Sequence, residues 1–120
     1  MHAARACLLL LGLADAAGTA ATERATVPMP VVQVGPHCWY VEGRLEDATR
    51  ENQGFMSNAG FVVTSDGVVV FDALGSPALA DRLIEIIRAH TDQPLRRVII
   101  SHYHADHFYG IAALRAAGAE

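Results

Sequence analysis

The sequence lacks lysine, and its nine basic residues are all arginines that nowhere form a run. Together with a formal net charge of −4, this disfavours the basic surface that nucleic-acid binding requires. Cysteine is also scarce, with only Cys7 and Cys38 in 120 residues. If a cleaved leader removes Cys7, no internal disulfide is available. Cys38 lies beside Trp39 in a strand-like run, which indicates a small buried residue and not a nucleophile.

No apolar run is long enough to span a bilayer as a helix. The apolar stretch 6–14 follows a short basic start, and small residues at 14–16 and 19–21 offer cleavage patterns. This order predicts a signal peptide over residues 1–21, export to the periplasm, and no membrane contact after cleavage. The alternative is an alanine- and leucine-rich cytosolic helix, or a misplaced start codon.

Valine-rich runs and turn residues predict the first half of a sheet after an irregular linker over residues 22–30, which carries Pro28 and Pro30. The predicted strands before the first helix are residues 31–34, 37–41, 61–64 and 68–72. Asp66 and Gly67 lie between the last two strands, as is typical of a tight hairpin. The 120 residues allow one domain at most.

A helix is predicted from Ser76, an N-cap residue, followed by Pro77 at the first helical position. Its buried face is marked at helical spacing by Leu79, Leu83, Ile86, Ile87 and His90. His90 is expected to meet the negative end of the helix dipole, and Pro94 closes the segment.

Four side chains of the types that bind metals fall within six residues, after a predicted buried strand over residues 96–101 and before a helical stretch over 108–117. They are His102, His104, Asp106 and His107. Imidazole and carboxylate groups bind zinc, iron and manganese, and residues two apart in an extended segment can converge on one ion. The alternative is a polar loop in which Asp106 acts only as a helix N-cap.

The H-x-H-x-D-H pattern after a hydrophobic strand resembles the first metal motif of the metallo-β-lactamase superfamily, and residues 58–72 resemble that family's N-terminal hairpin. The resemblance covers residues 31–120. Within the superfamily, the chain is similar to an exported branch associated with sulfur-oxidation and quinoprotein-relay clusters. The resemblance implies an α/β (α+β) fold, the αββα sandwich of two similar halves. This chain would be its N-terminal half, a mixed sheet with helices on one face.

The resemblance also implies roles for the motif residues. His102 and His104 would bind a first metal ion, and Asp106 and His107 a second, with Asp106 as the catalytic residue that orients the attacking water. Zinc is the expected metal, as two ions in the complete protein, while iron or manganese suits the same ligands. Asp72 would brace the motif loop, or would be a plain turn carboxylate. The loop before the hairpin would place its residues near substrate, or would be a plain solvated loop that carries no site: Asn52, Gln53, Phe55 and Met56.

No histidine, cysteine or aspartate follows His107, although the family supplies its remaining ligands from later motifs. The chain is therefore expected to be an inactive fragment, prone to association, of a hydrolase that uses metal-activated water on a small-molecule substrate. The first candidates for a substitute ligand would be His37, His90 and Glu120. Two alternatives stay open: a non-enzymatic metal- or partner-binding module that uses this half alone, and an iron-dependent redox enzyme on the same fold.

Overall fold

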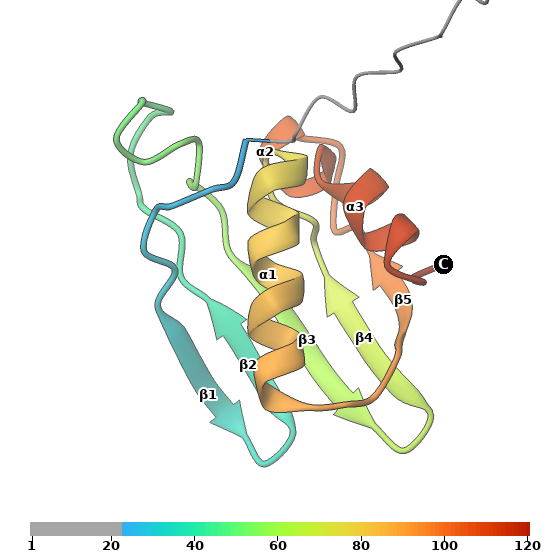
Figure 1. Cartoon of the computed structure of the whole chain (residues 1–120). Coiled ribbons are helices and arrows are strands. Elements are labelled where there is room, and N and C mark those ends of the chain that lie inside the picture. The colour runs from blue at the N-terminus through green and yellow to red at the C-terminus, as the bar shows by residue number, and fades with distance from the viewer. Residues whose placement is uncertain (1–22) are drawn as a thin grey trace, which may run out of the picture.

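The computed structural model describes residues 23–120, which form a single five-stranded sheet with helices on one side (Figure 1). In chain order the elements are β1 Val31–Gly35, β2 Cys38–Val41, β3 Ala59–Thr64, β4 Gly67–Phe71, α1 Pro77–His90, β5 Leu95–Ile99, α2 Ala105–Phe108 and α3 Ile111–Ala116. The predicted signal peptide lies outside the described residues. Among those described, no helix has the length and apolar character to cross a membrane.

The strands are arranged in sequence order, and the sheet is mixed, as the sequence predicts. Strands β1 to β4 pair antiparallel, with short turns between β1 and β2 and between β3 and β4 and a longer loop over residues 42–58 between β2 and β3. Strands β4 and β5 run parallel because α1 carries the chain back across the sheet. The hairpin between β3 and β4 turns where predicted, and Gly67 supplies the positive φ of 133°. The parallel register places Phe71 beside Ile99, so both strands end at one edge.

Helix α1 begins and ends where its local signals predict. The Ser76 hydroxyl accepts a hydrogen bond from the Leu79 N–H at 3.2 Å, and Pro77 opens the helix. At the other end, His90 Nδ1 lies 2.8 Å from the Ile86 carbonyl oxygen, which confirms its place at the negative end of the helix. The His90 ring also contacts the Trp39 ring, with centroids 5.3 Å apart. The helix is thereby anchored to the sheet at its far end.

The two faces of the sheet are buried to different extents. On β4, Val68 and Val70 are fully buried beneath the helices, whereas Phe71 points to the other side and is 45% exposed. On β5, only Leu95 is buried, and Ile99 is 42% exposed. The prediction of a buried strand over residues 96–101 is therefore wrong in its bounds and in its burial, because none of the described residues forms a layer over this open face.

The helical stretch predicted over residues 108–117 is two helices, α2 and α3, separated at Gly110. Gly110 lies against the carbonyl oxygen of Ala73, and a Cβ atom added to it would lie 2.6 Å from the Ala80 Cβ. Its N–H donates to the Leu74 carbonyl oxygen at 3.1 Å instead of continuing a helix. This close packing against the start of α1 breaks the helix, and local composition does not reveal it.

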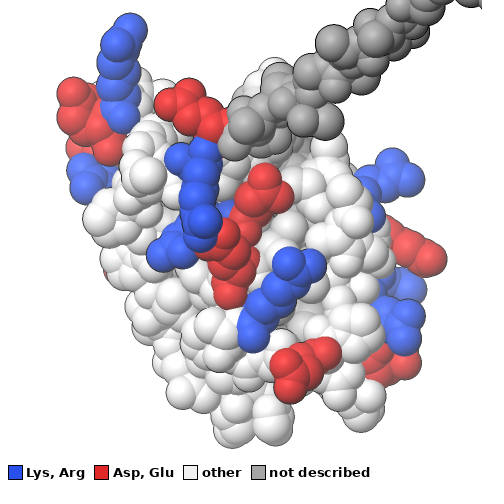
Figure 2. All heavy atoms as spheres, viewed as in Figure 1, with Lys and Arg blue, Asp and Glu red and all other residues white. Residues whose placement is uncertain are grey.

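Residues 23–30 contain no helix or strand, as expected, but they are not a free linker. Ala25, Val27 and Met29 are buried in the core, and the Pro30 carbonyl oxygen accepts a hydrogen bond from the Glu42 N–H at 3.1 Å. Arg24 pairs with Glu85 of α1 at 2.6 Å. Figure 2 shows acidic and basic side chains interspersed on this helix-covered face.

Candidate metal centre

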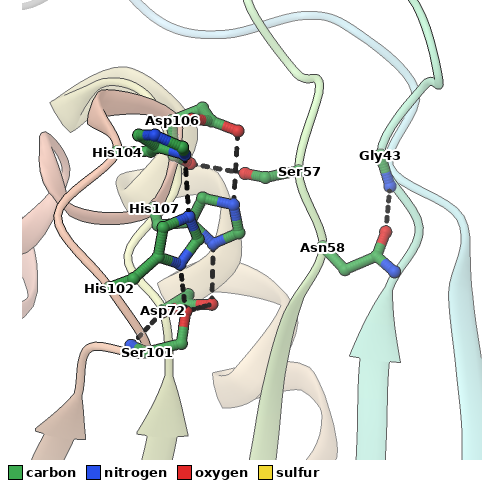
Figure 3. Close-up of polar contacts among 9 residues, drawn as sticks. All are labelled: Gly43, Ser57, Asn58, Asp72, Ser101, His102, His104, Asp106 and His107. Atoms are coloured by element: carbon green, nitrogen blue, oxygen red, sulfur yellow. Dashed lines mark hydrogen bonds and ion pairs between the residues drawn. The ribbon is translucent and has the colours of Figure 1, made fainter.

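The four predicted ligands gather at the edge of the sheet where β4 and β5 end (Figure 3). His102 and His104 lie in the loop after β5, and Asp106 and His107 lie in the first turn of α2. Helix α2 takes His104 as its N-cap, and that side chain makes no capping bond. The alternative in which Asp106 acts only as an N-cap is therefore wrong.

Asp72 is the centre of the hydrogen-bond network that shapes this loop. One carboxylate oxygen accepts the Ser101 N–H at 2.7 Å, and the other lies 2.9 Å from Ser101 Oγ and 2.8 Å from His107 Nδ1. Its backbone has a φ of 62°, a left-handed conformation that aspartate tolerates better than most residues. Asp72 thus braces the motif loop, as the resemblance implies.

The environment of Asp72 favours its charged form. Burial acts to raise its pKa, but hydrogen bonds from the Ser101 N–H, the His107 ring and the Ser101 hydroxyl outweigh burial and hold the pKa below its ordinary value. A charged carboxylate fixes the proton of His107 on Nδ1, so the Nε2 lone pair is free to bind an ion.

His102 is oriented by the same network. Because the Ser101 hydroxyl donates to Asp72, its oxygen accepts from His102 Nδ1, 2.9 Å away. This assignment of the His102 tautomer follows from the hydrogen-bond partners. The Nε2 atom of His102 then carries a lone pair and no hydrogen, and it faces His104 Nδ1 at 3.0 Å.

The spacing of the donor atoms fits metal binding in two pairs. His102 Nε2 and His104 Nδ1 are 3.0 Å apart, and His107 Nε2 and Asp106 Oδ2 are 3.3 Å apart. Two ligands at about 2.0–2.1 Å from one tetrahedral zinc ion are roughly 3.3 Å from each other. The His102 and His107 ring centroids lie 4.1 Å apart, so the two pairs are adjacent. Each pair therefore has the spacing to share one ion.

Within residues 23–120, neither pair is completed by a third ligand. Among residues 23–120, no group of three or more histidine, cysteine, aspartate or glutamate side chains is arranged to hold one metal ion. The substitute candidates are engaged elsewhere: His90 caps α1, and the backbone of Glu120 pairs with β5 through Arg96 and Val98. His37 lies in the turn between β1 and β2. The described residues thus supply two donors for each ion.

The loop between β2 and β3 has a different role from the one predicted for most of its residues. Asn52 is fully buried, and its side chain holds the loop by bonding the Thr49 and Gly54 N–H groups and the Asp47 carbonyl oxygen. Gln53 bonds the Thr26 N–H at 2.9 Å. These side chains fix the loop. Burial withdraws Asn52 from any substrate, whereas Gln53 is exposed and its contact with substrate stays a prediction.

Phe55 is also buried, and so is withdrawn from any substrate. Met56, the fourth residue predicted near substrate, lines an open hollow of about 460 Å³ that reaches Asp106. The other lining residues belong to the same loop: Arg44, Leu45, Glu46 and Asp47. Ser57 donates a hydrogen bond to the Asp106 carbonyl oxygen, a contact that no sequence pattern indicates because the two residues are 49 positions apart.

Comparison with known proteins shows a match to one family. The family model of the metallo-beta-lactamase superfamily matches residues 52–119. The metallo-β-lactamase FIM-1 from Pseudomonas aeruginosa, in its mono-zinc form, is 25% identical with a TM-score of 0.62, over 78% of this chain and 40% of its own. The stereoselective inverting sec-alkylsulfatase Pisa1 from Pseudomonas sp. is 25% identical with a TM-score of 0.56, over 72% of this chain and 12% of its own. The chain therefore spans less than half the length of either protein.

Proposed function

The chain belongs to the metallo-β-lactamase superfamily, and on that premise we propose that it is the N-terminal part of an exported, metal-dependent hydrolase. The observation that carries the proposal is the spacing of the two donor pairs, 3.0 Å for His102 with His104 and 3.3 Å for Asp106 with His107. Zinc is the metal we propose, because imidazole and carboxylate groups at this spacing suit it.

Each motif residue has a defined part in this proposal. A bound zinc ion would lower the pKa of its water to about 7 and polarise the bond under attack. His102 and His104 would hold one ion, while His107 and Asp106 would hold the other. Asp106 would also accept a hydrogen bond from the attacking water and orient it toward the substrate. Asp72 keeps the His107 proton on Nδ1, so that Nε2 stays available as a ligand.

We propose that the remaining ligands are supplied by the complete protein, because catalytic zinc takes three protein ligands and leaves a position for water. The described residues give each ion two. The hollow beside Asp106, lined by Leu45, Met56 and Arg44, is the proposed entry for a small-molecule substrate. Lactam and sulfate-ester hydrolysis are the activities named for the two similar structures, so they are the first to test here.

The test is a hydrolase assay on the complete protein with a chromogenic lactam, a thioester and an alkyl sulfate, before and after removal of metal by a chelator. We expect turnover of at least one substrate class, loss of turnover with the chelator, and recovery when zinc is added. The variant Asp106→Asn should lose turnover, and His37→Ala, which removes an exposed histidine away from the motif, should retain it. Oxygen uptake with bound iron, in place of hydrolysis, would support the redox alternative and contradict the proposal.

A further inference from the structure

Helix α2 is a single turn whose backbone groups are satisfied mostly by partners outside it. The Gly110 N–H, which would bond the Asp106 carbonyl in a continuing helix, donates to Leu74 instead. The Ala73 N–H donates to the His107 carbonyl oxygen at 2.7 Å. The Asp106 carbonyl oxygen therefore has no partner within its own helix.

Ser57 supplies the missing partner. Its hydroxyl donates to the Asp106 carbonyl oxygen, and the residue is only 6% exposed, so water does not readily replace this bond. Figure 3 shows the Ser57 side chain directed at the motif, while the next side chain, Asn58, turns away and accepts the Gly43 N–H at 2.9 Å. Ser57 and Asn58 thus fix opposite sides of the segment that leads into β3.

Gly75, in the turn that leads into α1, restricts the position of the Asp106 backbone. A Cβ atom added to Gly75 would lie 3.4 Å from the Asp106 Cα and 3.3 Å from the Gly54 carbonyl oxygen. The backbone of Asp106 is therefore held between the Ser57 hydroxyl and the turn that leads into α1. Its position determines where the carboxylate meets His107 Nε2.

We propose that Ser57 is a positioning residue for Asp106, which it holds so that the carboxylate and His107 Nε2 share one ion. The consequence of this role for metal binding rests on the proposed function, whereas the effect of Ser57 on α2 does not. A hydroxyl that fixes a ligand's backbone acts as the outer partners of metal ligands do, and loss of such a partner typically costs about 10- to 100-fold in metal affinity or activity.

The test compares Ser57→Ala with Asn58→Ala, a matched loss of one side-chain hydrogen bond in the same segment. Zinc affinity of the complete protein is measured by competition with a chromophoric chelator. We expect Ser57→Ala to weaken the ion held by Asp106 and His107 by about 10- to 100-fold, with the other ion bound nearly as in the wild type. Ser57→Thr keeps the hydroxyl and should restore most of the affinity, and Asn58→Ala should leave both ions unchanged.

A second variant moves Asp106 without touching Ser57. Gly75→Ala would place a Cβ atom 3.3 Å from the Gly54 carbonyl oxygen and 3.4 Å from the Asp106 Cα, and we expect this crowding to weaken the same ion selectively. Equal weakening of both ions in Ser57→Ala and Asn58→Ala would overturn the proposal, since that result indicates a general loss of structure. Wild-type affinity in Ser57→Ala would overturn it as well.

Hydrogen exchange in metal-free protein separates this proposal from the proposed function. The His107 and Tyr109 N–H groups close α2, so we expect their exchange to be about tenfold faster in Ser57→Ala and unchanged in Asn58→Ala. If wild-type protein binds no zinc but this difference appears, the proposed function fails while the positioning role of Ser57 stands. If zinc binds and exchange is the same in both variants, the positioning role fails alone.

Discussion

Apolar side chains are buried on one face of the sheet and partly exposed on the other, so the same kind of substitution is expected to have different effects on the two faces. On the closed face, Val68, Val70 and the apolar side of α1 are fully buried. On the open face, the neighbouring side chains Phe71 and Ile99 are partly exposed. The histidine–aspartate motif lies at the edge that both faces share, and the described residues give each proposed ion two donors. We propose that the complete protein supplies both the cover for this face and the remaining ligands.

The largest expected effect concerns the 120-residue chain by itself. We predict that it is neither a working enzyme nor a stable monomer, because exposed Phe71 and Ile99 favour association and the part of the chain that the structure describes gives each proposed ion only two ligands. Size-exclusion chromatography with light scattering should show oligomers or aggregates. Replacing Phe71 and Ile99 with serine should shift the chain toward monomer. A monodisperse monomer with zinc-dependent turnover would refute this.

The next prediction compares matched truncations on the two faces. Leu83→Ala on the closed face should lower the free energy of unfolding by about 2–5 kcal/mol, because it leaves a cavity in a packed core. Ile99→Ala on the open face should cost less than about 1 kcal/mol in this chain, since the side chain is already partly in water. Denaturant unfolding of a soluble form of the chain measures the free energy of unfolding of both variants. Similar costs at the two positions would mean that the open face is covered in solution.

A third prediction compares two glycines. Gly110→Ala should destabilise by about 1–3 kcal/mol or more, because its Cβ would meet the Ala73 carbonyl oxygen and lie 2.9 Å from the Ser76 carbonyl oxygen. Gly60→Ala on the open face should be milder, as its closest neighbour is the Trp39 carbonyl oxygen at 3.3 Å. Thermal unfolding of both variants is the measurement. A Gly110→Ala variant as stable as the wild type would contradict the packing that separates α2 from α3.

The smallest expected effect is on the outer surface of the closed face. Glu85 pairs with Arg82 at 2.8 Å and with Arg24 at 2.6 Å, and the Arg82 hydrogen bond is the main cause of its lowered pKa. A pKa lowered in the folded state gives stability that is present above the unfolded value, near 4.3, and is lost as pH falls through the folded value. Glu85→Gln should therefore flatten the pH dependence slightly, and salt should weaken the effect. Identical acid profiles in urea unfolding would argue against the pairing.

The parts of the fold that depend on local signals could be predicted from the sequence. Ser76 and Pro77 set the start of α1, and the hairpin turned at Gly67 as expected. The clustering of His102, His104, Asp106 and His107 could also be predicted, because all four side chains lie in one short segment, while their binding of metal stays a prediction. Its family was confirmed by the match to residues 52–119.

Contacts between distant segments could not be predicted. The break at Gly110 depends on its packing against Ala73 and Ala80, and the burial of Asn52 depends on the loop closing around its amide. Ser57 reaches Asp106 across 49 positions, with no pattern in the chain that pairs them. The prediction of a buried run over residues 96–101 did not allow for the open face that helices on only one side leave, and Ile99 is exposed on that face.

The most direct test of the central claim, that the motif binds metal through paired donors, is the zinc content of the His102→Ala/His104→Ala double variant by equilibrium dialysis. The two rings face one another at 3.0 Å, so removing both eliminates one donor pair and leaves the Asp72–His107 contact in place. With His37→Ala as the histidine control, we predict that the double variant of the complete protein loses most of its bound zinc while the control keeps it. Unchanged zinc in the double variant would contradict the site.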